Sequence, residues 1–313
     1  MKKLTRSECA EILLAHDNFA IVTHRRPDGD TIGSSALLCM GLRQLDKNAY
    51  ILENPEITPK YQHLHQGLTK CMAEEGDFVV SVDVASGNML PDCFKHLTFD
   101  LRIDHHGSAT SFTPVELVEP GAAACGETVY WVLQEMGAEL DIPMANALYT
   151  AVSTDTGCFR YANTTADTFT VAAACAKAGA EVFQINQALF ETNSLARLKV
   201  QSYMLQNAIF LQNGQVAICP LPKAVEVECG ANEDDLDNIS GFPRTIEGVK
   251  LAVTIREEGI HRVKMSVRAV PGQDAAALCA KFGGGGHKGA AGASMNMSMD
   301  EAVAAVVAAS PII

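Results

Sequence analysis

The sequence lacks any long apolar run. No window approaches the roughly 18 to 20 uninterrupted apolar residues that cross a membrane, because even the alanine-rich stretch near Ala172 contains Lys177 and Glu181. The first residues are not typical of a secretory signal, since Glu8 and Glu11 interrupt the positions that an apolar signal core needs. These absences predict a soluble, cytoplasmic protein with no membrane partner.

Cysteine pairs are also absent. The ten cysteines are spaced singly, without a C-x-x-C motif, which argues against a zinc ribbon or a dithiol redox centre. Cys39 and Cys175 lie in apolar runs, where a free cysteine behaves as a small hydrophobic residue in a reducing compartment. We therefore expect reduced thiols.

Basic residues are scarce. The chain has 24 Lys and Arg against 37 Asp and Glu, and its formal net charge is −13. This balance opposes tight binding of long duplex nucleic acid, which depends on many basic contacts to phosphates. A nucleotide or a short single-stranded RNA is compatible with it if bound metal ions supply local positive charge. The sequence leaves open whether the chain forms a homodimer.

The first part of the chain alternates short β-rich runs with helical patterns. This alternation is typical of an α/β domain with a mainly parallel sheet and helices on both faces. Because ligands bind at the carboxyl ends of such strands, the residues that follow each run are candidates for a site. The predicted strands are Phe19–Thr23, Ala49–Leu52, Phe78–Val82 and Leu101–Ile103.

The last part of the chain predicts a smaller α/β domain with a mixed or antiparallel sheet. Asn213-Gly214 lies between two apolar runs, which is a strong hairpin signal. A second hairpin is predicted from Lys250–Arg256 and Arg262–Val270. A chain of 313 residues is long enough for two such cores. We expect the first domain to span 1–194, a helical linker 195–209 and the second domain 210–313.

Acidic and histidine side chains follow several predicted elements. Each such segment alone is explained by a turn or a helix cap. Four of them at element ends of one sheet make independent capping a poor explanation, and metal binding a better one. The candidate residues are His24, Asp28 and Asp30 after the first strand, then Asp83, then Asp104, His105 and His106, and finally Asp155 after a helical run.

Small residues within the first segment have a predicted role as well. Gly29 should permit a tight turn that aims Asp28 and Asp30 at different positions. Gly33 and Ser34 should allow a close approach near the start of the following helix.

These motifs resemble the DHH phosphoesterases, a family named for the Asp-His-His motif seen here as Asp104-His105-His106. The resemblance covers nearly the full length, and the motifs occur in the family's order, although Thr31 stands where relatives commonly have Ala. The run Asp155–Tyr161 and the length resemble the nanoRNase and 3′-phosphoadenosine 5′-phosphate (pAp) phosphatase branch. The other matching motifs are His24-x-x-Pro27-Asp28-Gly29-Asp30-x-x-Gly33-Ser34, Asp83, Asp155-Thr156-Gly157 and Phe282-Gly283-Gly284-Gly285-Gly286-His287-x-x-Ala290-Ala291-Gly292.

The resemblance implies a two-metal enzyme that hydrolyses short oligoribonucleotides to mononucleotides, removes the 3′-phosphate of pAp, or does both. Oxygen ligands with two imidazoles favour Mn²⁺, with Mg²⁺ as the other candidate. His106 and Asp104 are expected to be catalytic. By the same resemblance, His24, Asp28 and Asp83 would bind one ion, Asp30, Asp83, His105 and Asp155 the second, and Arg160, Arg268, Gly284, Gly285, Gly286 and His287 the substrate.

Several alternatives stay open. The chain could instead be a phosphodiesterase of linear or cyclic dinucleotides, or a non-catalytic nucleotide-binding or metal-sensing protein. The last is disfavoured because every ligand position is filled. Taken singly, His106 could be a packed structural histidine, the glycine run a flexible linker and Arg268 a surface charge.

Overall fold

Short apolar segments form the strands of the first sheet. Phe19–Val22 (β2) and the following parallel strand Ala49–Leu52 (β3) are buried along their whole length, as expected for parallel strands that are covered on both faces. The computed structural model describes residues 2–107 and 110–310. The chain divides into two units, Met1–Thr192 and Asn193–Ile313.

The first unit contains a seven-stranded sheet in the order β1-β7-β6-β5-β2-β3-β4. Each neighbouring pair is parallel, so all strands point their carboxyl ends to one edge. The remaining strands are β1 (Lys2–Lys3), β4 (Thr69–Lys70), β5 (Phe78–Val82), β6 (Leu101–Asp104) and β7 (Val115–Val118).

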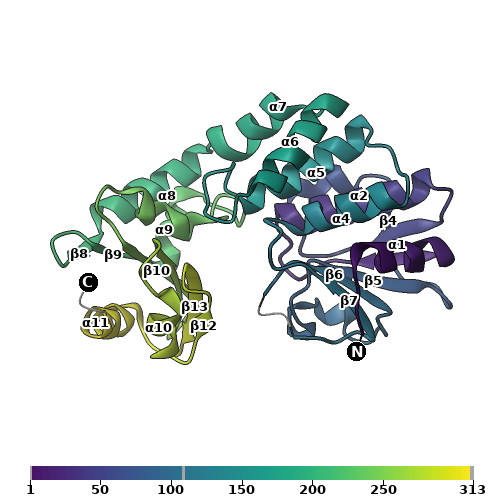
Figure 1. Ribbon diagram of the computed structural model, residues 1–313. Coiled ribbons are helices and arrows are strands. Elements are labelled where there is room, and N and C mark those ends of the chain that lie inside the picture. The colour runs from purple at the N-terminus through teal and green to yellow at the C-terminus, as the bar shows by residue number, and fades with distance from the viewer. Residues whose placement is uncertain (1, 108–109, 311–313) are drawn as a thin grey trace. The chain divides into compact units, whose positions relative to one another are not determined.

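Long helices pack on one face of this sheet. Figure 1 shows α2, α4 and α5 together on one side of the strands. The other face is covered by the segment that contains two short 3-10 helices, through Leu90 and Phe94. The helices are α1 (Arg6–Ala15), α2 (Gly29–Gln44), α3 (Pro59–Gln62), α4 (Cys125–Glu135), α5 (Ile142–Asp155), α6 (Ala166–Ala178) and α7 (Val182–Asn186), with 3-10 helices η1 (His63–His65), η2 (Gly87–Met89) and η3 (Asp92–Phe94) and a π-helical turn η4 (Gln187–Glu191).

Helices α2 and α5 cross closely at a glycine. A Cβ atom added to Gly33 would lie 2.3 Å from the carbonyl oxygen of Ala147 in α5. Only a residue without a side chain fits there, so Gly33 is required by the packing of α5 on α2. This contact holds the first half of α2 against the middle of α5.

The second unit contains a six-stranded mixed sheet in the order β12-β13-β11-β10-β9-β8. Its pairs are antiparallel except for β9 and β10. Its elements are α8 (Leu195–Gln206), β8 (Ile209–Leu211), β9 (Val216–Leu221), α9 (Lys223–Cys229), η5 (Ile239–Thr245), β10 (Leu251–Gly259), β11 (Arg262–Ala269), α10 (Ala275–Ala280), β12 (Gly285–Gly286), β13 (Ala290–Met295) and α11 (Met299–Ala309).

The predicted fold class is confirmed in both units. The Asn213-Gly214 hairpin joins β8 to β9, and the second predicted hairpin joins β10 to β11. Helix α8, which falls in the predicted linker, packs within the second unit, where its Val200 and Met204 are buried against β9. None of the helices in the described ranges combines the length and the apolar character needed to cross a membrane.

Candidate metal centre

The candidate residues gather at the carboxyl edge of the first sheet. Strands β6, β5 and β2 are consecutive neighbours there, and the chain leaves each of them at a candidate residue. The first turn of α2 and the last residue of α5 contribute the others. The residues are His24 after β2, Asp83 after β5, Asp104, His105 and His106 at the end of β6, Asp28 and Asp30 at the start of α2, and Asp155 at the end of α5.

One group of ligand atoms forms around His24. Its Nε2 lies 3.8 Å from Oδ1 of Asp28 and 3.6 Å from Oδ2 of Asp83. The other ring nitrogen, Nδ1, lies 2.8 Å from the carbonyl oxygen of Arg25. A carbonyl oxygen only accepts, so Nδ1 carries the proton, and Nε2 is the nitrogen that faces the two carboxylates and can bind a cation.

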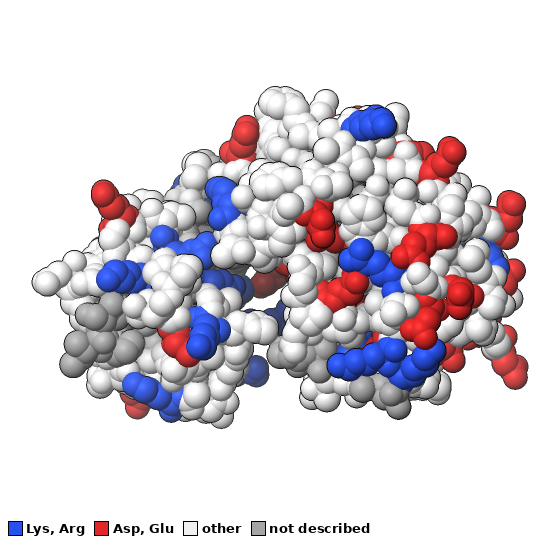
Figure 2. All heavy atoms as spheres, in the orientation of Figure 1, with Lys and Arg blue, Asp and Glu red and all other residues white. Residues whose placement is uncertain are grey.

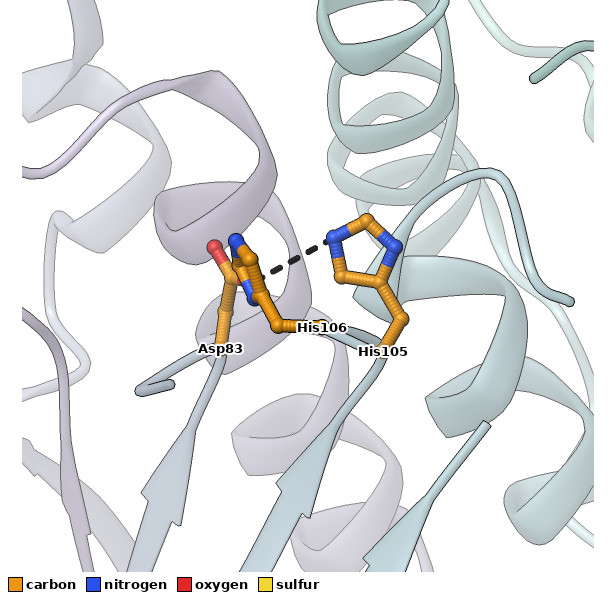
Figure 3. Close-up of side chains that lie close together, drawn as sticks. All are labelled: Asp83, His105 and His106. Carbon is orange, nitrogen blue, oxygen red and sulfur yellow. Dashed lines mark ion pairs between the residues drawn. The ribbon is translucent and has the colours of Figure 1, made fainter. Parts of the chain in front are cut away.

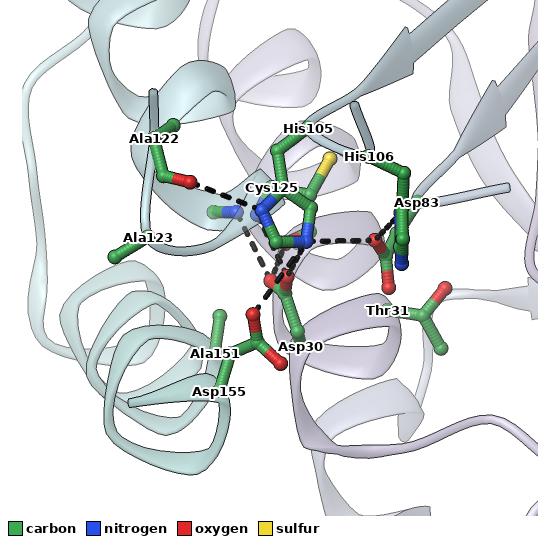
Figure 4. Close-up of polar contacts among 12 residues, drawn as sticks. Asp30, Thr31, Asp83, His105, His106, Ala122, Ala123, Cys125, Ala151 and Asp155 are labelled. Carbon is green, nitrogen blue, oxygen red and sulfur yellow. Dashed lines mark hydrogen bonds and ion pairs between the residues drawn. The ribbon is translucent and has the colours of Figure 1, made fainter. Parts of the chain in front are cut away.

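A second group forms around His105. Its Nε2 lies 3.6 Å from Asp30 and 3.6 Å from Oδ1 of Asp83. The carboxylate of Asp155 lies 3.5 Å from the same nitrogen, and Figure 4 shows these side chains pointing toward one another. Nδ1 of His105 donates to the carbonyl oxygen of Ala122 at 3.1 Å, so Nε2 is again the nitrogen that faces the carboxylates.

These groups fit divalent cations. Separations of 3.5–3.8 Å exceed a hydrogen bond but suit two ligands around one ion with bonds of about 2.1 Å. Oδ1 of Asp83 is buried and accepts no hydrogen bond from any residue in the described part of the chain. A buried carboxylate oxygen without a donor needs a counter-charge. The ligand atoms form the groups His24–Asp28–Asp83, Asp30–His105–Asp155 and Asp83–His105–His106, each within 4.8 Å.

Asp83 occupies an unusual backbone conformation. Its φ is +60°, in the left-handed region that asparagine and aspartate tolerate better than most residues. Its N–H donates to Ile103 at 2.9 Å, and the hydroxyl of Thr31 donates to the carbonyl oxygen of the preceding Val82 at 3.1 Å. Thr31 therefore connects α2 to the end of β5, beside the carboxylate of Asp83.

The carboxylate of Asp30 is held by three donors. Its Oδ1 accepts from the hydroxyl of Ser34 at 2.7 Å and from the N–H of Gly126 at 3.1 Å. Its Oδ2 accepts from the N–H of Cys125 at 2.7 Å. Cys125 and Gly126 are the first residues of α4, so the helix N-terminus stabilises this charge.

Asp104 orients His106. Its Oδ1 accepts from Nδ1 of His106 at 2.8 Å and from the N–H of His105 at 2.8 Å. Nδ1 of His106 also lies 3.6 Å from Asp83, and Figure 3 shows both imidazoles beside that carboxylate. This hydrogen bond keeps the proton on Nδ1 and leaves Nε2 of His106 as the nitrogen that can contact a ligand.

Burial and crowding shift the pKa values in this cluster. Burial, followed by the charge of Asp83, raises the pKa of Asp30 well above its usual range. Burial also raises the pKa of Asp155 to about 7, against the opposing effect of His105. Burial lowers the pKa of His105, but the three carboxylates around it prevail and raise it to about 9. A metal-free cluster therefore retains protons that an incoming cation displaces.

Both units match known protein families. Residues 18–152 match the DHH family, N-terminal domain, and residues 213–309 match the DHHA1 domain. The bifunctional oligoribonuclease and PAP phosphatase NrnA of Thermus thermophilus is 34% identical over 309 residues, which cover 96% of this chain and 91% of that protein. The chain belongs to the DHH family. It is therefore a phosphoesterase, an enzyme of the hydrolase class.

Other relatives of this DHH phosphoesterase are also similar over nearly their full length. The Bacillus subtilis protein of the same name as the Thermus one is 27% identical over 305 residues, covering 95% of each chain. A crystal structure of an exopolyphosphatase-related protein from Bacteroides fragilis is 25% identical, with a TM-score of 0.83 over 97% of this chain and 95% of that chain.

The expected substrate residues of the DHH phosphoesterase fall in both units. Arg160 is exposed in the first unit, where its Nε donates to the carbonyl oxygen of Gly157 at 2.6 Å. In the second unit, Arg268 of β11 pairs in register with Ala290 of β13. The N–H of His287 donates to Ala290 at 2.8 Å. Gly285 and Gly286 form β12, which pairs with β13, so these residues lie on neighbouring strands.

The glycine cluster is part of the sheet, not a linker. A Cβ atom at Gly284 would lie 2.2 Å from the carbonyl oxygen of Gly292, and Gly286 has a φ of +141°. Gly285 has no heavy atom within 4 Å of such a Cβ position among the residues described. Gly284 and Gly286 are therefore required by the close approach of β12 to β13, and Gly285 leaves the backbone accessible.

The prediction that Gly29 permits a tight turn was wrong. Asp28 is the N-cap of α2 and Gly29 is the first helical residue, so no tight turn separates Asp28 from Asp30. A Cβ atom on Gly29 would lie 2.5 Å from Oγ1 of Thr154 in α5. Glycine is needed because α5 brings Thr154, and with it Asp155, against the start of α2.

Sequence reasoning missed two supporting amides. Asn54 follows β3, and its Nδ2 donates to Thr23 and to the carbonyl oxygen of His24 at 2.8 Å. Asn163 donates from Nδ2 to the carbonyl oxygens of Ala123 and Asp155. The strand-end position of Asn54 was a usable signal, whereas nothing in the sequence near Asn163 indicated its two acceptors.

Proposed function

We propose that this phosphoesterase uses two divalent cations to cleave short oligoribonucleotides to mononucleotides and to remove the 3′-phosphate of pAp. The observation that carries the proposal is the position of Asp83, whose two oxygens lie 3.6 Å from His24 and 3.6 Å from His105. One carboxylate can thus serve two neighbouring ions. The substrate class is supported by the relatives named oligoribonuclease and PAP phosphatase.

The proposed ligands divide into two sets that share Asp83. His24, Asp28 and Asp83 hold one ion, and Asp30, Asp83, His105 and Asp155 hold the other. Oxygen donors with one imidazole in each set favour Mn²⁺, with Mg²⁺ as the alternative. When bound, a pair of such ions supplies positive charge at the phosphate and favours deprotonation of the attacking water. The ions also offset the crowding of four carboxylates.

The protein's own groups orient the reaction. Asp30 is fixed by Ser34 and the start of α4, so its carboxylate is placed before substrate arrives. His106, held by Asp104, is the proposed contact for the scissile phosphate or the leaving oxygen. Arg160 and the second-unit residues Arg268, Gly284, Gly285, Gly286 and His287 are proposed to bind the nucleotide. We place this activity in the cytoplasm, where such substrates arise.

A substrate panel tests the proposal. Purified protein with Mn²⁺ should hydrolyse di- to pentaribonucleotides and pAp faster than cyclic dinucleotides or pyrophosphate. Mn²⁺ should restore chelated enzyme better than Ca²⁺ or Zn²⁺. Full hydrolysis in excess chelator would overturn the two-cation proposal, and a clear preference for dinucleotides, linear or cyclic, would replace it with a dinucleotide phosphodiesterase.

A further inference from the structure

Two arginines lie between proposed ligands of one ion. Arg25 and Arg26 come directly after His24 and shortly before Asp28, and both side chains are exposed. Residues one or two positions apart are separated by at most about 7 Å along the backbone. Both guanidinium groups therefore start from backbone positions beside the metal centre.

The backbone that carries these arginines is firmly anchored. The N–H of Arg25 donates to the carbonyl oxygen of Met89 at 2.7 Å. The carbonyl oxygen of Arg25 accepts from Nδ1 of His24 at 2.8 Å, and Asn54 donates to the carbonyl oxygen of His24 at 2.8 Å. A loop held on both sides presents its side chains in a restricted range of directions, which reduces the entropy lost on binding.

The two guanidinium groups have no close partner within the part of the chain that the structure describes. Neither guanidinium makes an ion pair or a hydrogen bond with a described residue. Arg25 has one weak electrostatic effect, on Asp92, whose pKa is lowered first by its 2.6 Å pair with Lys95 and less by Arg25. By contrast, Arg102 is paired with a glutamate.

The first unit, which contains these two arginines, is acidic. Residues 1–192 contain nearly twice as many Asp and Glu as Lys and Arg, whereas residues 193–313 contain nearly equal numbers. Figure 2 shows acidic side chains spread over the visible face of the first unit. An anionic ligand is therefore repelled by most of this surface and attracted by the metal centre and by exposed arginines.

Arg26 is also held in a strained conformation. Its φ is +50°, and Arg, unlike Gly or Asn, gains no local compensation there. Such conformations are energetically unfavourable and persist where the surroundings impose them, commonly at ligand-binding sites.

We propose that Arg25 and Arg26 bind a second, uncleaved phosphate of the substrate. The ligand class is a nucleotide with a phosphate in addition to the scissile one, such as the 5′-phosphate of pAp or the next phosphodiester of a short RNA. Guanidinium groups suit this role because they bind phosphate oxygens through paired, charge-assisted hydrogen bonds. The inference rests on the proposed function, because it assumes that the metal centre takes the scissile phosphate.

A substrate pair that differs by one phosphate tests the inference. Wild-type enzyme with Mn²⁺ should prefer pAp to adenosine 3′-monophosphate in kcat/KM. The double variant Arg25→Ala/Arg26→Ala should reduce the ratio of the two kcat/KM values roughly 10- to 100-fold, the effect expected for a charge-assisted contact. Arg25→Lys/Arg26→Lys should recover part of the preference. Lys177→Ala removes an exposed cation on α6 and should leave the ratio unchanged.

The outcomes separate this inference from the proposed function. An unchanged ratio in the double variant, or an equal loss on both substrates, overturns the second-phosphate contact. If wild-type enzyme cleaves neither nucleotide, the proposed function fails. The inference is then tested by calorimetric titration, which measures the dissociation constant of pAp in the presence of Mn²⁺. A dissociation constant that rises at least tenfold in the double variant supports the contact, and an equal one in both proteins overturns it.

Discussion

Nδ1 of His106 donates to Oδ1 of Asp104 at 2.8 Å, and the aspartate is completely buried. Oδ1 also accepts the backbone N–H groups of His105 and His106. Burial lowers the pKa of His106, but the hydrogen bond to Asp104 and nearby negative charges prevail and raise it. Asp104 therefore sets both the ring orientation and the proton affinity of His106.

Asp104→Asn tests this relationship. The amide keeps the size of the side chain but removes its charge, so His106 loses its fixed tautomer. We expect kcat to fall roughly 10²- to 10⁴-fold, the range for a positioned acid or base, while bound manganese measured by elemental analysis stays the same. The effect should not add to that of His106→Ala, because the two residues act as a unit. Metal loss in Asp104→Asn would instead indicate a structural role.

Asp83→Asn should be the most damaging single ligand change. The amide carries no charge, so both ions lose the carboxylate that they would share. Because several kcal/mol of charge stabilisation is then lost, we expect turnover to fall at least about 10³-fold. Manganese stoichiometry should fall together with kcat. Asp167→Asn, an exposed change in α6, serves as the control. Near-normal turnover in Asp83→Asn would show that Asp83 is not the bridge.

The parts of the site that could be predicted from sequence lie at strand ends. Phe19–Val22 and Phe78–Val82 are short, mainly apolar strands, and Leu101 and Ile103 are the apolar residues of a third. Parallel strands necessarily present their carboxyl ends at one edge. The acidic and histidine residues after them could therefore be grouped without a structure. Family resemblance then divided them into ligand sets.

The supporting contacts could not be predicted, because they use backbone atoms. Asp30 accepts from the N–H of Cys125, and His105 donates to the carbonyl oxygen of Ala122. Every residue except proline offers a similar N–H and every residue a carbonyl, so neither contact leaves a residue signature. Likewise, the contact between Gly29 and Thr154 depends on how two helices distant in sequence cross.

His65 predicts a pH dependence of stability. Burial lowers the pKa of His65 from 6.5 to about 4, so the unfolded chain binds a proton between these values and the folded chain does not. The contribution of His65 to the free energy of unfolding is therefore complete above pH 6.5 and is lost as the pH falls toward 4. The free energy of unfolding is measured with denaturant, in the presence of chelator. Between pH 7 and pH 5 it should fall by about 2 kcal/mol more in the wild type than in His65→Gln. Parallel losses in the two proteins would contradict this account.

Gly284 and Gly285 form a matched pair for a stability test. Gly284→Ala places a Cβ atom 2.2 Å from a carbonyl oxygen, whereas Gly285→Ala meets no heavy atom of the described residues within 4 Å. We expect Gly284→Ala to destabilise the second unit by roughly 1–3 kcal/mol and Gly285→Ala to change stability by less than about 0.5 kcal/mol. Thermal unfolding measures both. Equal melting temperatures would show that the backbone at Gly284 does not pack closely on β13.

Arg268→Ala should separate substrate binding from chemistry. Arg268 lies on β11 in register with Ala252 of β10 and Ala290 of β13, and its side chain is half-buried, with Nη1 3.2 Å from the carbonyl oxygen of Val267. Loss of a charge-assisted contact worth about 1.5–3 kcal/mol should raise KM roughly ten- to a hundred-fold for pAp and short oligoribonucleotides. Because the contact would hold a nucleotide end, bis-p-nitrophenyl phosphate should be little affected. Bound manganese should not change.

The matched control for Arg268→Ala is Arg262→Ala, which removes an arginine from the start of the same strand, where its side chain is 61% exposed and pairs with Glu258 at 3.3 Å. A surface ion pair of this kind contributes less than about 1 kcal/mol, so this variant should keep wild-type KM values. If Arg268→Ala reduces activity equally on nucleotides and on the chromogenic ester, or releases manganese, Arg268 supports the fold. Only a loss confined to nucleotide substrates is expected from an anchor, because the chromogenic ester retains the scissile phosphate but lacks the nucleoside that Arg268 would help to hold.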